Sequence, residues 1–273
     1  MLWTPFILFL FAALTPLIVR VTRGAAGWFL AAVPAALVVV FAGYLPIAPG
    51  ESVREARQRF PELRVRLGIE LEYRPEWTDT FDRLTGEVPF DFVLGSVHIV
   101  DGCNISGGPH RDLFFVGRTQ DEAYGQYFRE LDAMVEWGGF DVVSHFDLIT
   151  RFGHRHFGPY EPARYRDVIQ PVLEKMVSRG LGLEINTSGV AGPGAPYPER
   201  DILVWAREAG VPALTIGTDS HRPDAFADGL VEGVRLAQDA GWNEFTLYEG
   251  REPAGALSIE EAAAWAACPG RPG

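Results

Sequence analysis

From residue 51 onward, short apolar segments alternate with longer segments of helical periodicity, and this alternation limits the folds open to the chain. Enrichment in β-branched residues predicts strands at Val65–Glu70, Phe90–His98, Phe140–His145, Gly182–Asn186, Ala213–Asp219 and Phe245–Tyr248. The amphipathic pattern predicts helices at Glu51–Leu63, Gln120–Trp137, Arg164–Arg179, Glu199–Ala209, Asp224–Ala240 and Ser258–Ala267. Alternation of this kind indicates an α/β fold with a parallel sheet, either an open doubly wound sheet or a barrel.

Each of the five central strands ends in charged or polar side chains. In chain order, the residues at these ends are Glu70, His98, His145, Glu184 with Asn186, and Asp219 with His221. In a parallel α/β barrel the carboxyl ends of the strands meet on one face, where active sites are built. Imidazole and carboxylate groups are the ligands of zinc, manganese and iron sites. The strand ends therefore predict a metal site.

Other motifs of this type are weaker or lacking. His154 and His156 have the spacing of a metal-binding pair, but they follow no apolar strand, and we expect them in a solvated loop. No GxGxxG or GxxxxGK[ST] motif follows any expected strand, so neither a dinucleotide site nor a P-loop is supported. Cys103 and Cys268 form no CxxC pair, which argues against a disulfide framework or a thiolate zinc site.

The formal net charge of −12 is carried by the body of the chain. An acidic body argues against nucleic acid as a partner, because phosphate backbones are held by Lys and Arg. If the substrate is a small-molecule phosphate ester, its charge must be met locally by metal ions or a few arginines.

The first fifty residues contain only two charged side chains, Arg20 and Arg23. On either side of them, Leu2–Val19 and Gly24–Ala48 are uncharged runs, each long enough to cross a bilayer as a helix. We therefore expect residues 1–50 to form a transmembrane helical hairpin, with a buried hairpin of a soluble protein as the alternative. Such a hairpin would tether a cytoplasmic body to the cytoplasmic membrane through residues 2–48. This stretch also resembles the amino terminus of the large subunit of multisubunit sodium/proton antiporters.

The segments GIELEY, FVLGSVH, FDVVSHFDLI, LEINTSG, YPERDIL and TIGTDSH occur in this order between residues 51 and 253. In content and spacing they resemble the polymerase-and-histidinol-phosphatase (PHP) superfamily, specifically its histidinol-phosphatase branch. The resemblance implies a distorted (β/α)7 barrel with two or three divalent ions (Zn, Mn or Fe) at its mouth, over residues 51–273. It also implies metal-dependent hydrolysis of L-histidinol phosphate to histidinol and phosphate in histidine biosynthesis.

The resemblance assigns a role to individual residues. It implies that Glu70 bridges two metals and that His98 and His145 are ligands of one of them. It further implies that Asp219 is a ligand of the other bridged metal and His221 of a third. Arg151 and Asn186 are the expected phosphate contacts in the substrate-binding site. For Arg151, a place in a solvated loop is the alternative.

The pattern departs from the family at its start. The family opens with an HxH motif and two further histidine ligands, whereas no histidine precedes His98 here. The expected domain therefore lacks the first quarter of the family barrel. One metal site, made by Glu70, His98 and His145, is complete. In addition, Gly189–Ala191 contains no arginine, whereas the histidinol-phosphatase branch usually has one at this place.

Three hypotheses follow for the function. The first is a histidinol-phosphatase-type phosphomonoesterase. The second is a catalytically impaired, membrane-tethered remnant or fusion that binds at most one metal. The third, an antiporter fragment, is disfavoured because the hairpin has no buried ionisable residues for an ion path.

Overall fold

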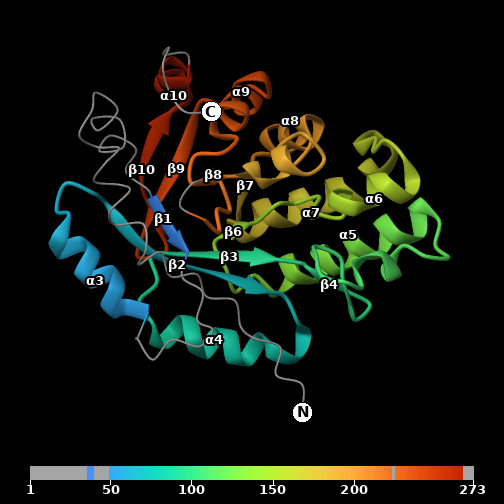
Figure 1. The fold of residues 1–273 in the computed structure, drawn as a ribbon, viewed down its shortest axis with the longest axis horizontal. Helices are drawn as coiled ribbons and strands as arrows, with labels where there is room; N and C mark the ends of the chain where they lie inside the picture. Colours follow the sequence, from blue (N-terminus) through green and yellow to red (C-terminus); the bar gives the residue numbers. More distant parts are fainter. Residues whose placement is uncertain (1–35, 40–48, 223–224, 267–273) are drawn as a thin grey trace.

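The structure is a computed structural model, and it describes residues 36–39, 49–222 and 225–266. Six strands form one sheet in the order β1-β2-β3-β6-β7-β8 (Figure 1). Their bounds are Ala36–Val39 (β1), Val65–Glu72 (β2), Phe92–Ser96 (β3), Val142–Val143 (β6), Gly182–Asn186 (β7) and Leu214–Gly217 (β8). Every neighbouring pair in this sheet is parallel, which confirms the expected parallel α/β sheet.

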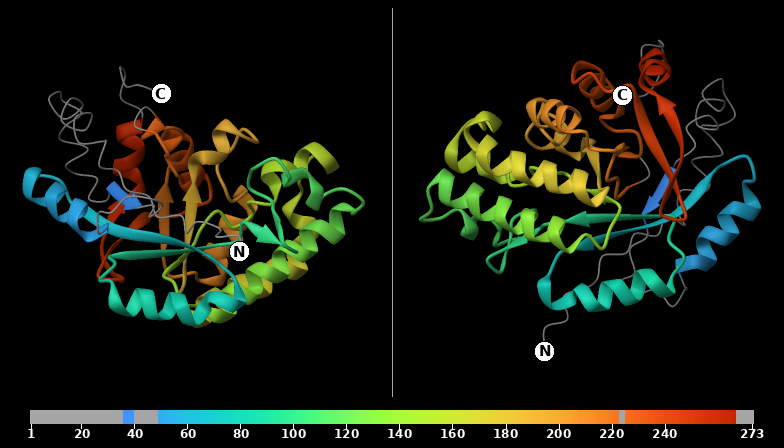
Figure 2. Two further views of the ribbon diagram at one scale, coloured as in Figure 1. Left: turned by 60° about the horizontal axis from the view of Figure 1, so that its bottom comes forward. Right: turned by 180° about the vertical axis from the view of Figure 1, so that it is seen from behind.

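The sheet is curled, with its two ends running in different directions. Figure 2 shows β2 and β3 crossing the view while β7 and β8 run steeply across them. The spatial order of the strands follows the order of the chain without a reversal. A doubly wound sheet would reverse its order at a switch point, so this topology is that of a partial barrel. Among the described residues, β1 and β8 do not pair with each other.

Helices cover the outside of the curled sheet (Figures 1 and 2). They are α3 (Pro49–Arg59), α4 (Thr78–Glu87), α5 (Gln120–Trp137), α6 (Thr150–Phe157), α7 (Arg166–Arg179), α8 (Arg200–Ala209), α9 (Leu230–Asp239) and α10 (Ile259–Ala266). Short 3-10 helices span Pro75–Trp77, Arg111–Phe114, Pro162–Tyr165 and Thr187–Ala191. Two antiparallel pairs complete the fold, β4 (Ile99–Val100) with β5 (Cys103–Asn104), and β9 (Glu244–Glu249) with β10 (Glu252–Ser258).

The bounds of α5 follow directly from its sequence. Thr119 and Glu122 form a reciprocal capping box that satisfies free backbone N–H groups at the start of the helix. Gly138 ends the helix in the left-handed conformation, at φ 69°, which glycine adopts without steric cost. The expected range Gln120–Trp137 is therefore confirmed to the residue.

Side chains alternate along β2 between the two faces of the sheet. Leu67, Ile69 and Leu71 are buried in the main core, whereas Glu70 and Glu72 are partly exposed on the other face. This period of two is inherent in a strand, and it directs the apolar residues toward the covering helices. Burying one such leucine or isoleucine contributes about 1.5–3 kcal/mol, which fixes the register and with it the face on which the carboxylates lie.

A buried carboxylate, Asp91, links several elements at the opposite, amino-terminal end of the strands. Asp91 accepts hydrogen bonds from Arg57 at 2.6 Å, from the backbone N–H of Leu67 at 2.8 Å and from that of Gly250 at 3.2 Å. It thereby ties α3, β2 and the β9–β10 turn to the start of β3. This end of the sheet provides stability and lies away from the strand ends that carry the predicted site.

The prediction of a helical hairpin over residues 1–50 is wrong at Ala36–Val39, which form β1. These four residues pair in parallel with Val65–Gly68 of β2. The segment is rich in valine, which favours an extended backbone, and pairing with β2 satisfies the backbone groups of its edge. Residues 1–35 and 40–48, the rest of the predicted hairpin, lie outside the described residues. No helix in the described part of the chain is both apolar enough and long enough to span a membrane.

Candidate metal centre

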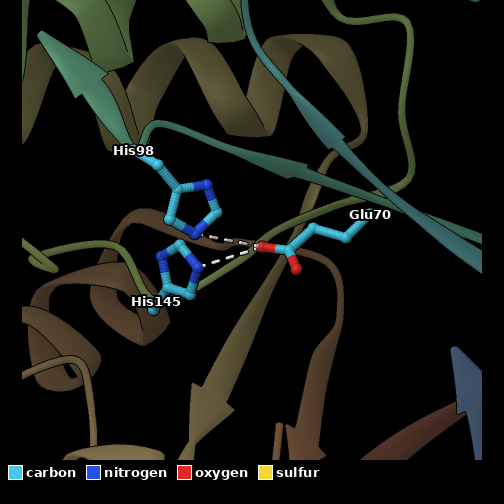
Figure 3. Close-up of side chains that lie close together, drawn as sticks. All are labelled: Glu70, His98 and His145. Carbon is cyan, nitrogen blue, oxygen red and sulfur yellow. Dashed lines mark hydrogen bonds and ion pairs between the residues drawn. The ribbon is translucent and has the colours of Figure 1, made fainter. Parts of the chain in front are cut away.

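Three of the predicted ligands lie together at the carboxyl ends of β2, β3 and β6. The close-up in Figure 3 shows the rings of His98 and His145 turned toward the carboxylate of Glu70. The Oε1 atom of Glu70 lies 3.0 Å from Nε2 of His145 and 3.6 Å from Nε2 of His98. The three potential ligand atoms all lie within 4.8 Å of one another, a separation that one metal ion could span. The chemistry and spacing of this group therefore fit a divalent cation.

His98 is held in place by Glu72, which lies two residues after Glu70 on the same face of β2. The Oε2 atom of Glu72 is 2.6 Å from Nδ1 of His98. The same carboxylate accepts the backbone N–H groups of His98 and Ile99. These bonds fix the ring so that Nδ1 donates to Glu72 and Nε2 faces Glu70. A carboxylate behind a ligating histidine is a common arrangement in metal sites, where it sets the tautomer and the orientation.

The charges in this group hold the carboxylate ionised and the imidazole protonated when no cation is bound. Burial alone would raise the pKa of Glu70, but the hydrogen bond from His145 and the charges of both histidines lower it to about 2. Burial alone would lower the pKa of His98, but Glu72, Glu70 and Asp219 together raise it to about 9. A proton on His98 therefore occupies the position that a cation would take.

His145 has an unusual backbone conformation, and its ring is almost completely buried. Its φ is 22°, in a region that residues with a side chain rarely adopt, and the residue is 2% exposed. Its Nδ1 atom is buried and has no hydrogen-bond partner among the described residues. Its backbone N–H donates to Oε2 of Glu184 at 3.2 Å. The strained backbone and this bond bring Nε2 within reach of Glu70.

Asp219 lies in electrostatic range of the group but outside its closest cluster. Burial and the charge of Glu70 raise the pKa of Asp219, while His145, His221 and His98 lower it. Asp219 also has a positive φ of 50°, two residues after the end of β8. The cluster of ligand atoms within 4.8 Å of one another contains neither Asp219 nor His221. The second and third metal sites therefore remain predictions.

His221 is exposed and is bound locally to Asp219. Its Nδ1 atom donates to the carbonyl oxygen of Asp219 at 2.7 Å and lies 3.8 Å from its carboxylate. The side chain of His221 is 59% exposed, in contrast to the nearly buried ring of His145.

The two predicted substrate contacts lie in different environments. Arg151 is at the start of α6, half-buried, with its guanidinium 5.9 Å from the ring of Phe152. Among the described residues it makes no ion pair. Burial raises the pKa of the nearby Tyr197, and the charge of Arg151 offsets part of that rise. Asn186 is buried and engaged internally, donating from Nδ2 to Glu184 and accepting from Ser188. Arg151 is thus the better placed of the two to reach an anion.

The segment containing His154 and His156 was predicted to be a loop, and this is wrong, because both lie in α6. His154 interacts through Nδ1 with the carbonyl of Thr150, and His156 through Nε2 with Asp112, each at 2.9 Å. These contacts explain how a helix so rich in basic residues is stabilised. Among the described residues, neither histidine belongs to the metal-like cluster.

Glu72 and Glu184 support the centre, and the sequence carries only weak signals of these supporting roles. Glu72 could have been found from the i, i+2 spacing that places it beside Glu70 on β2. Glu184 stands at the expected strand end, but its contacts with the backbone of His145 depend on the pairing of β6 with β7.

A model of the PHP domain family matches residues 50–188, slightly more than half of the chain. The chain belongs to the PHP domain family. A probable histidinol-phosphatase from Deinococcus radiodurans is 29% identical over 201 residues, which cover 71% of this chain and 72% of that protein. The histidinol-phosphatase of Lactococcus lactis is 24% identical over 190 residues, covering 69% of this chain and 70% of the relative.

A solved structure resembles the fold of this PHP domain. It is the histidinol phosphate phosphatase of Lactococcus lactis in complex with zinc, L-histidinol and phosphate. The two structures agree with a TM-score of 0.64 at 21% sequence identity, over 80% of this chain and 82% of the other. This agreement confirms the PHP-type barrel as the fold.

Proposed function

We propose that this PHP-domain protein is a metal-dependent phosphomonoesterase of the histidinol-phosphatase type. Its substrate is L-histidinol phosphate, and its products are L-histidinol and phosphate. The observation that carries the proposal is the convergence of Glu70, His98 and His145 from three adjacent strands on one point. The relatives from Deinococcus radiodurans and Lactococcus lactis, which bear the histidinol-phosphatase name, support the same substrate. A place in histidine biosynthesis and a cytoplasmic location follow from that substrate.

Glu70, His98 and His145 would hold the cation, and Asp219 and His221 are the proposed ligands of further ions. A bound zinc, manganese or iron ion supplies Lewis-acid stabilisation of a phosphoryl group and lowers the pKa of water. Glu72 orients His98, and the backbone bond from Glu184 orients His145. Arg151 offers the positive charge that a phosphate dianion requires in an otherwise acidic chain, and Asn186 is the proposed second contact.

The test is phosphate release from L-histidinol phosphate by the purified full chain, with zinc, manganese or iron added. We expect release that depends on the added ion and is lost in Glu70→Gln. Release that is independent of added metal and unchanged in this variant would contradict the proposal.

One observation favours the alternative of an impaired remnant, because the close cluster contains three ligands while Asp219 and His221 lie outside it. A remnant would bind one ion per chain without turnover, whereas an active enzyme would release phosphate. Counting bound ions and measuring turnover on the same sample distinguishes the two.

A further inference from the structure

Glu184 is a buried carboxylate directly behind the metal-like cluster. It lies on β7 and is 3% exposed. Its Oε2 atom alone accepts three hydrogen bonds, from the hydroxyl of Ser144 at 2.7 Å, the backbone N–H of His145 at 3.2 Å and the amide of Asn186 at 3.1 Å. One oxygen therefore joins the end of β6 to β7 and fixes the residue from which the His145 ring projects.

The other oxygen of Glu184 faces the neighbouring strand β8. A Cβ atom added to Gly217 would lie 2.4 Å from Oε1 of Glu184, so only glycine leaves room for this carboxylate. Gly217 is the last residue of β8, two positions before Asp219. The carboxylate thus contacts both strands that flank β7 at the end where the predicted ligands lie.

Hydrogen bonding alone does not explain why this residue is a glutamate. A glutamine could place its single carbonyl oxygen at the position of Oε2 and accept the same three bonds. Among the described residues, Glu184 makes no ion pair with a lysine or arginine. The charge of Glu184 is attracted by His145 and repelled by Glu70 and Asp219. Burying a carboxylate that lacks a lysine or arginine partner is costly unless another cation lies nearby.

We propose that Glu184 is a positioning residue of the metal centre, orienting His145 and supplying negative charge that balances a divalent cation held by Glu70, His98 and His145. This inference rests on the proposed metal site. A divalent cation in the cluster would balance this buried charge, which pairs with no lysine or arginine in the described part of the chain. Neutralising it should therefore weaken metal binding without weakening the metal-free fold.

The test compares Glu184→Gln with the wild type in the full chain. We expect the zinc affinity, measured by competition with a chromogenic chelator, to fall 10- to 100-fold, the range typical for residues that support metal ligands. We expect the thermal midpoint of the metal-free variant to be equal to or above that of the wild type. A structural role alone would lower the midpoint and leave the zinc affinity unchanged.

Asp91→Asn is the matched control, because it neutralises a buried carboxylate at the opposite end of the sheet, where a guanidinium already pairs with it. It should lower the thermal midpoint and leave zinc affinity unchanged. Wild-type affinity in Glu184→Gln, or a metal-free variant that fails to fold, would overturn the inference. A wild-type chain that binds no zinc would remove the proposed metal site and this inference with it.

Discussion

The carboxylate of Glu72 lies 2.6 Å behind the Nδ1 atom of His98 and leaves the Nε2 atom facing Glu70. The carboxylates of Glu70 and Glu72 thus lie on opposite sides of the His98 imidazole. Both face it because residues two apart in a strand lie on the same face of the sheet. The ring is oriented before any cation arrives. Metal binding by His98 should therefore depend on Glu72 as well as on His98 itself.

We expect Glu72→Ala to weaken zinc binding by about 10- to 100-fold, because His98 loses the acceptor that sets its tautomer and orientation. Chelator competition on the full chain measures this. Glu76→Ala is the control, since Glu76 is an exposed carboxylate that pairs with Arg74 beyond the end of the same strand. Equal affinities in the two variants would contradict the orienting role of Glu72.

Zinc binding near pH 7 should release about one proton per ion. The pKa of His98 is raised to about 9 in the metal-free protein, so a cation must displace the proton on Nε2. Calorimetry in buffers of different ionisation enthalpy gives the number of protons released, and the affinity should rise about tenfold per pH unit up to about pH 9. Binding that releases no proton would show that His98 is neutral or is not a ligand.

The same group sets a stability window for the metal-free protein. Because the folded-state pKa of His98 lies above its ordinary value of 6.5, its ion pairs stabilise the fold fully below about pH 6.5. This contribution is lost as the pH rises toward about 9. Thermal unfolding of His98→Gln should show a smaller fall in stability over that interval than the wild type shows.

Asp147 should produce a linkage of the same sign as His98, at lower pH and from an acid that is buried in its neutral form. It is fully buried, one of its oxygens accepts the backbone N–H of Glu199 at 3.0 Å, and the other has no partner among the described residues. Burial raises its pKa from 3.8 to about 7, so the folded protein holds a proton that the unfolded chain has lost. Stability therefore falls as the pH rises from about 4 to about 7.

Asp147→Asn should remove this part of the pH dependence, on the order of 4 kcal/mol between those limits, because the amide has no proton to lose. Denaturant unfolding of both proteins at several pH values measures the difference. Parallel curves for the two proteins would contradict the raised pKa of Asp147.

Two glycine substitutions should have opposite effects on the free energy of unfolding. At Gly95 in β3, a Cβ would lie 2.6 Å from the ring of Phe140, so Gly95→Ala should destabilise the fold by about 1–3 kcal/mol. At Gly86 in α4, nothing lies within 4 Å, so Gly86→Ala should stabilise it by about 1 kcal/mol. Chemical denaturation measures both, and the same sign in both variants would contradict the packing described for β3.

Much of the fold was predictable because local signals agreed with the tertiary structure. The bounds of α5 followed from its caps, and those of β7 from a buried apolar run bounded by Gly180 and Asn186. Helix α6 was missed because its basic composition resembles a loop, and its partners Phe115 and Asp112 come from a distant segment. Strand β10 was missed because proline and glycine interrupt its pattern. Its extended conformation is stabilised by antiparallel pairing with β9 and not by its own sequence.

The three close ligands were predictable because parallel strands place their carboxyl ends together. The roles of the other polar residues at the strand ends were not predictable from the sequence. Whether Asn186 faces a substrate or Glu184 depends on a side-chain rotamer and on the pairing of β7 with its neighbours. Ala36–Val39 misled the prediction for a related reason, since an uncharged run without periodicity is compatible with either a helix or a strand.

The most direct test of the account is anomalous diffraction at the zinc edge from crystals of the full chain grown with zinc. We predict a peak about 2.0–2.2 Å from a carboxylate oxygen of Glu70 and from the Nε2 atoms of His98 and His145. A zinc peak at other residues, or no peak near Glu70 in crystals that hold zinc elsewhere, would contradict the metal centre on which the proposed function depends.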